Sequence, residues 1–231
     1  MIECSHVYKR YKKSGKKALY DINLSVEQGE FIYIIGPTGS GKSTLIKILD
    51  AEEMPTKGEV KVAGIDLRKL RRSQIPLYRR NIGVVFQEYK LLPTKTVFEN
   101  IAYSLEVINM KKDMIQKRVS EVLEIVGLRD RANSFPSELS GGQQQRIAIA
   151  RAIANRPKVL IADEPTGNLD IQTSDGIMAV FERINEQYGT TILMVTHDIT
   201  IVNKFLKRTV AIEHGHIVAD LPGGGYVRHN L

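Results

Sequence analysis

The sequence has little cysteine and no long apolar run, and each shortage excludes a class of protein. Cys4 is the only cysteine, so an internal disulfide is impossible and a reducing compartment such as the cytosol fits. No apolar run approaches the roughly 18–20 residues that are needed to cross a bilayer. The first residues have no signal-peptide pattern, and the chain has neither internal repeats nor low-complexity linkers. A globular protein without a membrane span of its own fits these absences.

The composition is ordinary for a globular protein, with a basic balance. The 231 residues are 42% hydrophobic and 26% charged, which is enough for one core in a domain with a subdomain. The net charge of +7 suits nucleic acid or the anionic inner face of a membrane. A solvated surface is the simpler interpretation, because the basic pairs are not gathered with aromatic residues. These pairs are Lys9-Arg10, Lys12-Lys13, Lys16-Lys17, Arg68-Lys69, Arg71-Arg72, Arg79-Arg80, Lys111-Lys112 and Lys117-Arg118.

A glycine-rich stretch between two apolar runs predicts the order strand, loop, helix. The stretch fits the phosphate-binding pattern of a glycine, four residues and Gly-Lys-Ser/Thr. Its glycines let backbone N–H groups face phosphates, and the helix predicted for 44–50 adds the positive end of its dipole. We therefore expect Lys42 to contact the β- and γ-phosphates of a nucleotide and Ser43 to hold Mg²⁺. The predicted phosphate-binding residues are Gly36, Pro37, Thr38, Gly39, Ser40, Gly41, Lys42, Ser43 and Thr44.

Three other apolar stretches also end in polar residues. These residues are Gln87 after 81–86, Asp163 and Glu164 after 158–162, and His197 after 190–196. Because the carboxyl ends of parallel strands meet at one edge of a sheet, they should converge with the glycine-rich loop. Asp163 is then placed to contact Mg²⁺, and Glu164 to act as general base for an attacking water. His197 can touch the γ-phosphate or orient that water.

Residues 88–138 interrupt the α/β pattern with helical signals. Thr96 opens one helix, Asp113 with Gln116 resembles a capping pair for a second, and Gly127 suits its end. Elsewhere, residues 66–80 are basic and helical up to Pro76, and the stretches 57–64 and 210–218 predict hairpins. Helices are also expected near 143–155 and 174–188. The predicted fold is therefore α/β, with a β-rich start and a helical subdomain inserted into the core.

A second glycine-rich segment, residues 139–143, lies at the start of a predicted helix and can offer N–H groups to an anion. It is far in sequence from the first loop, so one chain is not expected to bring both to the same nucleotide. A two-fold dimer would let Ser140 and Gly142 of each chain close on the γ-phosphate held by its partner. A plain helix N-cap is the alternative.

An aromatic residue ahead of the first glycine loop is a candidate for stacking on adenine. Both Tyr8 and Tyr11 precede the loop, where an adenine ring needs a stacking face. For either residue, a half-buried strand tyrosine is the alternative, and position alone leaves this open.

Together, these motifs resemble the complete motif set of an ABC-transporter ATPase subunit, over essentially the whole chain. The sequence Leu-Ser-Gly-Gly-Gln at 139–143, hereafter the signature segment, is highly specific to that family. The resemblance implies a P-loop NTPase fold of the ABC type, with a mostly parallel core sheet, an N-terminal antiparallel β subdomain and an inserted α-helical subdomain. A single domain would span 1–231, with its core in 1–87 and 144–231 and its helical subdomain in 88–143.

The same resemblance implies a homodimer that holds ATP and Mg²⁺ between its subunits, closing on binding and opening after hydrolysis. It assigns Tyr11 to adenine stacking, Asp170 to a contact across the dimer, and Gln87 to Mg²⁺ and coupling. The catalytic residues would be Glu164, His197 and Gln87, and the metal ligands Ser43, Gln87 and Asp163. From the signature segment, the nucleotide contacts would be Ser140, Gly141, Gly142 and Gln143.

The branch of the family is indicated by residues 167–170, where Gly-Asn-Leu-Asp stands in place of the commoner Ser-Ala-Leu-Asp. This variant resembles the branch with cell-division, lipoprotein-release and MacB-type ATPases, and the stretches 83–93 and 96–102 resemble its cell-division members. That implies a peripheral protein on the cytoplasmic side of the cell membrane. Its partner would be the integral membrane protein FtsX and, indirectly, the divisome and cell-wall hydrolases of septation.

Two other functions stay open at this point. One is the ATPase of a lipoprotein-release, MacB-type or solute transporter, which the motifs do not separate from a cell-division ATPase. The other is a soluble ABC ATPase that acts on nucleic acid. That class would predict a long coiled-coil insertion or tandem cassettes, and neither is in the sequence, so no nucleic-acid partner is expected.

Overall fold

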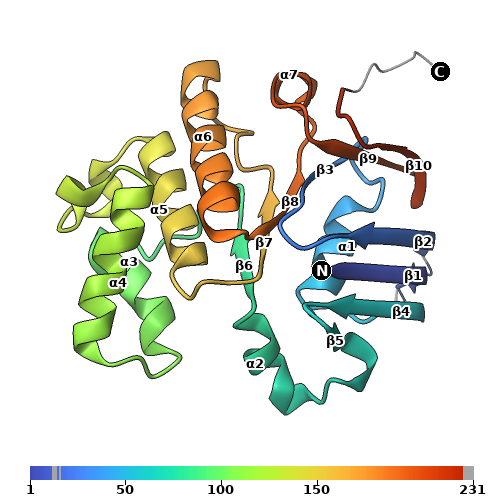
Figure 1. Ribbon diagram of the computed structural model, residues 1–231, viewed down its shortest axis with the longest axis horizontal. Helices are drawn as coiled ribbons and strands as arrows, with labels where there is room; N and C mark the ends of the chain where they lie inside the picture. The colour runs from blue at the N-terminus through green and yellow to red at the C-terminus, as the bar shows by residue number, and fades with distance from the viewer. Residues whose placement is uncertain (12–14, 16, 226–231) are drawn as a thin grey trace.

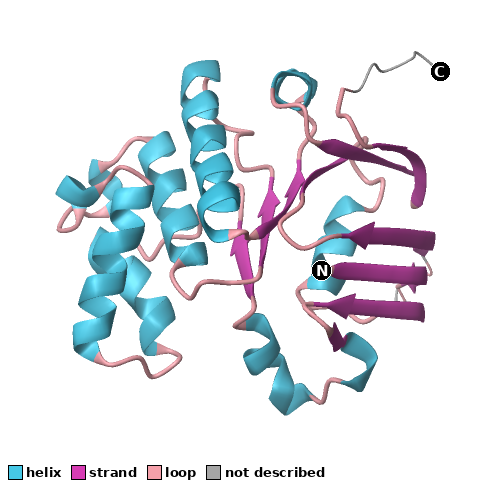
Figure 2. Ribbon diagram, in the orientation of Figure 1, coloured by secondary structure: helices cyan, strands magenta, loops and turns pink. Residues whose placement is uncertain are grey.

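The computed structural model describes residues 1–11, 15 and 17–225, which form two sheets with helices packed between and beside them (Figures 1 and 2). Lys12, Lys13 and Lys16 of the basic pairs lie outside the described residues. The strands are β1 (Ile2–Arg10), β2 (Lys17–Val26), β3 (Phe31–Ile35), β4 (Lys57–Val62), β5 (Ile65–Asp66), β6 (Ile82–Val85), β7 (Val159–Asp163), β8 (Thr191–Val195), β9 (Arg208–Glu213) and β10 (His216–Leu221).

The larger sheet has six strands in the order β10-β9-β3-β8-β7-β6, and all but β10 run parallel. The smaller sheet has the order β2-β1-β4-β5 and is antiparallel. This arrangement confirms the predicted mostly parallel core sheet with an N-terminal antiparallel sheet. No helix among the described residues is long and apolar enough to cross a membrane.

Helices cover both faces of the six-stranded sheet, which explains why the inner strands β3, β7 and β8 are nearly continuous apolar runs. The helices are α1 (Lys42–Leu49), α2 (Ile75–Arg79), α3 (Val97–Glu106), α4 (Lys112–Ile125), α5 (Gly141–Ile153), α6 (Ile171–Tyr188) and α7 (Ile199–Lys204). Short 3₁₀ turns are η1 (Leu67–Lys69), η2 (Arg72–Gln74), η3 (Arg129–Arg131) and η4 (Pro136–Glu138). In Figure 1, α1 lies between the two sheets, and α3 to α6 lie on the other side of the six-stranded sheet.

The alternation of side chains along β3 divides the core between these two layers. Phe31, Tyr33 and Ile35 pack with the apolar residues of α3 to α6. Ile32 and Ile34 point the other way, into a second cluster with α1 and the antiparallel sheet. Because successive strand residues face opposite sides, one strand of five residues joins both cores. The loop that follows β3 is therefore held from two sides.

Several predicted helix ends are wrong by a few residues, and the reasons are local. Pro76 was expected to end a helix, but it lies in the first turn of α2, where its missing N–H is not needed. Asp113 does not cap α4, because the N-cap is Lys111 and Asp113 falls in the first turn. The sequence analysis also missed α7, whose six residues follow the N-cap Asp198. Gly127 ends α4 as expected, with a left-handed φ of 70°.

Two other helices begin earlier than their apolar periodicity indicated. α5 starts at Gly141 with Ser140 as N-cap, and α6 starts at Ile171 with Asp170 as N-cap. The extra residues are Gly141 and Gly142 in α5 and Ile171, Gln172 and Thr173 in α6, and in both helices the side chain of the N-cap residue stabilises this first turn. The domain division predicted at 143/144 falls within α5, so this helix runs from the signature segment into the core.

Candidate functional site

The carboxyl ends of four parallel strands lie in register at one edge of the six-stranded sheet. Ile34 of β3 and Asp163 of β7 both pair with Val195 of β8, and Val85 of β6 pairs with Ala162. The structure thus brings together the loop after β3, Gln87, Asp163-Glu164 and His197. We call this the carboxyl edge. Its chemistry depends on how each of these side chains is held.

The glycine loop after β3 (residues 36–44), here called the phosphate loop, adopts a conformation that only glycine tolerates well. Gly36, Gly39 and Gly41 have φ of 144°, 80° and 118°. A Cβ on Gly36 would lie 2.0 Å from the carbonyl oxygen of Ile212, whereas a Cβ on Gly39 would meet nothing within 4 Å. The loop is therefore packed on its outer side and open at Gly39, which leaves space for a ligand.

The start of α1 lacks the usual cap. Its N-cap is Gly41, and no side chain bonds the first N–H groups of the helix. Lys42 folds back over the loop, and its Nζ donates to the carbonyl oxygens of Gly36 at 2.6 Å and Pro37 at 3.0 Å. The hydroxyl of Ser40 is buried and has no hydrogen-bond partner among the described residues. Such unsatisfied donors around a cationic amine suit a phosphate chain.

Lys42, Asp163 and Glu164 form an interacting set of charges. Burial lowers the pKa of Lys42, while Glu164 and Asp163 act to raise it. Burial also raises the pKa of Asp163, helped by the neighbouring Glu164 and opposed by Lys42 and Lys90. Two neighbouring carboxylates and one amine are thus partly withdrawn from water at the same edge. A magnesium–phosphate ligand suits this set, because its cation can bind to a carboxylate and its phosphate anion to the amine of Lys42.

Glu164 is held in place by its backbone and by His197. Its φ of 51° is left-handed, and its N–H donates to the carbonyl oxygen of Val195 at 2.9 Å. Glu164 Oε2 lies 2.8 Å from His197 Nδ1 and also accepts from the His197 backbone N–H at 3.3 Å. A cavity of about 360 Å³ is lined by His197 together with Pro37 and Thr38 of the phosphate loop. The residue that holds the Glu164 carboxylate therefore also borders a space next to the phosphate loop.

The predicted metal ligands come from three different segments. Ser43 is exposed in the first turn of α1, Asp163 is half-buried at the end of β7, and Gln87 is half-buried two residues beyond β6. A Cβ on Gly167 would lie 3.0 Å from Nε2 of Gln87, so this glycine leaves room for the glutamine side chain. No cluster of three or more His, Cys, Asp or Glu is found in the described part of the chain. One carboxylate with hydroxyl and amide oxygens is a donor set that suits Mg²⁺ shared with phosphates.

Tyr11 lies beside the phosphate loop, whereas Tyr8 does not. Tyr11 Oη is 3.4 Å from Thr44 Oγ1, and the ring lines a cavity of about 140 Å³ together with Gly39, Lys42 and Ser43. Tyr8 is on β1 and does not line that cavity. The geometry therefore favours Tyr11 as the aromatic residue next to a nucleotide.

The signature segment is away from the phosphate loop of the same chain. α5 contacts β6, α3, α4 and α6, whereas α1 contacts β2 and β7. Ser140 Oγ accepts from the Gln143 N–H at 3.3 Å, and Gln143 Oε1 accepts from the Ser140 N–H at 3.0 Å. A Cβ on Gly142 would lie 2.3 Å from Cγ2 of Thr173. Asp170 caps α6 by accepting from the Thr173 hydroxyl at 2.6 Å and from the Thr173 N–H at 2.9 Å, and these bonds, the hydroxyl first, lower the pKa of Asp170.

Arg151 is a residue near the site that sequence reasoning missed. Its guanidinium donates to the carbonyl oxygens of Lys90 at 2.6 Å and Tyr89 at 2.9 Å. Both acceptor residues are left-handed, with φ of 49° and 54°, and they follow Gln87 closely. Arg151 therefore ties the Gln87 segment to α5. The available signal was a single arginine at the end of the apolar run 147–150.

Comparisons with known proteins agree with this geometry. The ABC transporter family matches residues 19–167. Two solved structures cover nearly the whole chain. The dimeric post-hydrolysis ATP-binding cassette MJ0796 bound to ADP and Pi is 38% identical, with a TM-score of 0.85, and covers 98% of this chain and 100% of its own. Clostridium perfringens cbiO1 is 29% identical, with a TM-score of 0.90, and covers 96% and 88%.

The fold and the site define the class as an ATPase of the ATP-binding cassette type. Among curated relatives, the cell division ATP-binding protein FtsE of Streptococcus pneumoniae (strain D39) is 56% identical over 98% of this chain and 97% of its own. FtsE of Bacillus subtilis is 53% identical over 98% of both chains, and FtsE of Escherichia coli K12 is 43% identical over 94% and 97%. The chain therefore belongs to the ABC transporter ATPases and, within them, to the FtsE cell division proteins.

Proposed function

We propose that this chain is the Mg²⁺-dependent ATPase of a membrane complex in bacterial cell division and works as a homodimer. One observation carries the enzymatic part. The Glu164 carboxylate is fixed by His197 at the same sheet edge as Lys42 and the phosphate loop. A general base, an amine and unsatisfied N–H groups at one edge are what phosphoryl transfer to water needs.

Each residue then has a separate task in hydrolysis. Tyr11 stacks on adenine, and the phosphate loop with Lys42 binds the phosphates. Glu164 accepts a proton from the attacking water while the bond between the γ-phosphorus and the β-phosphate oxygen breaks. His197 holds Glu164 and faces the γ-phosphate. Mg²⁺, bound by Ser43, Asp163 and Gln87, would neutralise charge on the phosphates.

The homodimer follows from the distance in the fold between the signature segment and the phosphate loop. Ser140, Gly141, Gly142 and Gln143 lie at the start of α5, which packs mainly on β6, α3, α4 and α6, whereas α1 packs mainly on β2 and β7. We therefore expect a second copy to supply the contact of these residues with the nucleotide. Asp170, at the exposed start of α6, would meet the partner across the same interface. The dimeric state named for the MJ0796 cassette supports this arrangement.

The FtsE relatives support FtsX as the membrane partner, with the divisome and cell-wall hydrolases downstream. The chain would then be a peripheral protein on the cytoplasmic side of the cell membrane. A helix of FtsX would dock on the segment from Gln87 to Asn100, between the core (1–87 and 144–231) and the helical subdomain (88–143). Leu91 and Leu92, both half-buried there, would contact it.

A solute transporter is the second candidate, and one comparison favours it. The methionine import ATP-binding protein MetN of Bifidobacterium longum is 41% identical over 94% of this chain, which spans 56% of MetN. The FtsE relatives match at higher identity and over nearly their full length, so cell division remains the better proposal.

Capture of the membrane partner tests the proposal. The Glu164→Gln chain should bind ATP but hydrolyse it about 10²–10⁴-fold more slowly, so that closed dimers accumulate. When this variant is tagged in its own cells, supplied with ATP and purified in mild detergent, FtsX should co-purify with wall hydrolases. A permease with a solute-binding protein or a lipoprotein would instead support a transporter. Hydrolysis at the wild-type rate would remove Glu164 as the base.

A further inference from the structure

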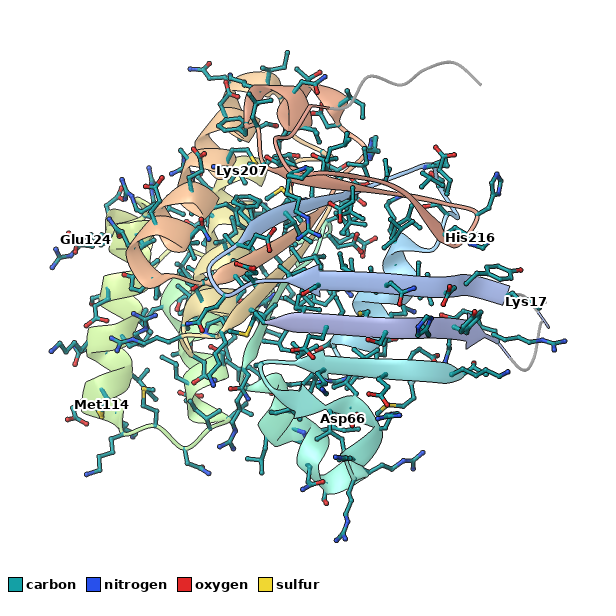
Figure 3. The ribbon with its side chains drawn as sticks, turned by 45° about the vertical axis from the view of Figure 1, so that its right-hand side comes forward. Lys17, Asp66, Met114, Glu124, Lys207 and His216 are labelled. Atoms are coloured by element: carbon teal, nitrogen blue, oxygen red, sulfur yellow. The ribbon has the colours of Figure 1, made fainter. Side chains whose placement is uncertain are left out.

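The segment that joins the two sheets carries most of the net charge of the protein. Residues 66–80, here called the basic segment, contain six Arg or Lys residues and one acidic residue, a net +5 in a chain of net +7. The segment includes η1, η2 and α2. Figure 3 shows it around the labelled Asp66, where nitrogen-tipped side chains project away from the fold. Its function is not explained by the ATPase site.

Two buried anchors fix this segment to the protein. Leu67 and Tyr78 are 0% and 1% exposed, and the Tyr78 hydroxyl donates to the carbonyl oxygen of Leu49. The segment therefore lies at the carboxyl end of α1 and the amino end of β6. The phosphate loop and Gln87 lie at the opposite ends of the same two elements. A ligand on the basic segment would leave the nucleotide site free.

Between and beside the anchors, several cations lack an internal partner. Asp66 pairs with Arg68 at 3.1 Å and lies 4.0 Å from Lys69, and Glu59 also pairs with Arg68. Asp50 lies 3.5 Å from Arg79. The remaining three, which are exposed and form no ion pair within the described residues, are Arg71, Arg72 and Arg80.

Apolar side chains are interleaved with these arginines. Leu77 is 56% exposed on α2, and Leu70 and Ile75 are half-buried. Such a mixture of fixed cations and exposed aliphatic groups is typical of protein surfaces that rest on lipid headgroups. Binding of single-stranded nucleic acid usually adds exposed aromatic rings, and the one aromatic residue here, Tyr78, is buried.

We propose that the basic segment docks on the anionic lipid headgroups of a membrane. Arg71, Arg72 and Arg80 pair with the lipid phosphates, and Leu77 inserts at the boundary between headgroups and acyl chains. This contact goes beyond the proposed function, because it requires neither ATP nor a membrane protein. It would give the ATPase a second attachment to the membrane, apart from its partner.

Sedimentation of the purified chain with protein-free vesicles tests this proposal. We expect binding to phosphatidylcholine vesicles that contain phosphatidylglycerol, little binding to phosphatidylcholine alone, and a steep loss of binding with salt. Each cation near an anionic surface is worth about a fivefold change in affinity, so Arg71→Glu, Arg72→Glu and Arg80→Glu together should weaken binding at least on the order of 100-fold. Leu77→Ser should weaken it less, and by an amount that salt does not change.

A matched control distinguishes vesicle binding by the basic segment from vesicle binding that depends only on the net charge of the protein. Lys111, Lys112 and Lys117 on or next to α4 are also exposed and form no ion pair within the described residues. Their triple change to Glu alters the net charge equally and should leave most vesicle binding intact. Equal losses in the two triple variants, or unchanged binding after the arginine changes, would overturn the proposal. Salt-sensitive binding to duplex DNA without vesicle binding would overturn it in favour of nucleic acid. ATP hydrolysis by each variant verifies folding.

Discussion

Two helices of this protein begin at glycine-rich segments, and they differ in what satisfies their first N–H groups. α1 starts after a left-handed Gly41 with no side-chain cap. α5 starts after Ser140, which forms a complete capping box with Gln143. The first helix start therefore leaves its first N–H groups without a side-chain partner, whereas the second pairs the N–H groups of Ser140 and Gln143 within the chain.

This difference shows how one chain can hold two kinds of anion site. The phosphate loop leaves the first N–H groups of α1 without a side-chain cap and the Ser40 hydroxyl without a partner among the described residues, so its affinity for phosphate comes from these donors. In the signature segment, the capping box already pairs the N–H groups of Ser140 and Gln143. The contribution of this segment to binding must come from being placed by a second subunit.

Lys42→Ala should have the largest effect, because it removes the one cation that folds over the phosphate loop. We expect hydrolysis to fall on the order of 10²–10³-fold, as for loss of one transition-state donor, and ATP affinity to fall with it. Steady-state kinetics and a nucleotide-binding titration measure both. Lys47→Ala, on the same helix, removes only an exposed ion pair with Glu52 and serves as the control. Equal losses in both variants would show a general effect on α1.

Ser140→Arg should also stop hydrolysis, although Ser140 is outside the phosphate loop. ATP binding by the monomer should stay near the wild-type value, because α5 packs mainly on β6, α3, α4 and α6 and α1 mainly on β2 and β7. Mixing this variant with Lys42→Ala should restore part of the activity, because one of the two composite sites is then intact. Turnover measured across mixing ratios should pass through a maximum. No rescue at any ratio would contradict independent composite sites.

Arg151→Met should reduce turnover by about tenfold, with a smaller change in KM for ATP. The left-handed pair Tyr89 and Lys90 stores strain of about 1–3 kcal/mol per residue, and without the guanidinium it can relax and displace Gln87. Arg151→Lys should recover part of the rate. Arg146→Met is the matched control, because Arg146 also donates to backbone carbonyls, those of Val126 and Gly176. The interpretation fails if both methionine variants lose stability and rate equally.

Gln143→Ala should have the smallest effect on turnover of these variants, and Glu99→Ala is its matched control. It breaks half of the capping box of α5, at a cost of about 1 kcal/mol in unfolding free energy or about 2–4 °C in Tm. Glu99→Ala breaks the equivalent box at α3, where Thr96 is the N-cap. Thermal melts should show similar losses in both. Only Gln143→Ala should also alter turnover. If Glu99→Ala changes turnover equally, the signature segment acts only as a helix cap and has no separate role in hydrolysis.

Much of the carboxyl edge could be predicted from the sequence, because it depends on local patterns. Continuous apolar runs identified the buried strands, and the polar residue after each run marked where it ends. Parallel strands must then bring Gln87, Asp163 and His197 to one edge. The register between β3, β8 and β7 follows this expectation.

Features that depend on tertiary contacts could not be predicted in the same way. Nothing near Arg151 in the sequence indicates that it binds carbonyl oxygens about 60 residues away. The contact between Glu164 Oε2 and His197 Nδ1 joins two loops, and only the folded sheet sets its 2.8 Å distance. The starts of α5 and α6 were missed because capping residues, and not apolar periodicity, determine them.

The packing of the phosphate loop also determines when, during synthesis of the chain, this loop can reach its final structure. Gly36 abuts the carbonyl oxygen of Ile212, and the Gly215 N–H donates to the Ser40 carbonyl oxygen at 2.8 Å. A loop encoded in the first fifth of the chain thus lacks two neighbours until the last hairpin has left the ribosome. Any stabilisation by ATP that depends on these two contacts therefore begins only when synthesis of the chain is nearly finished.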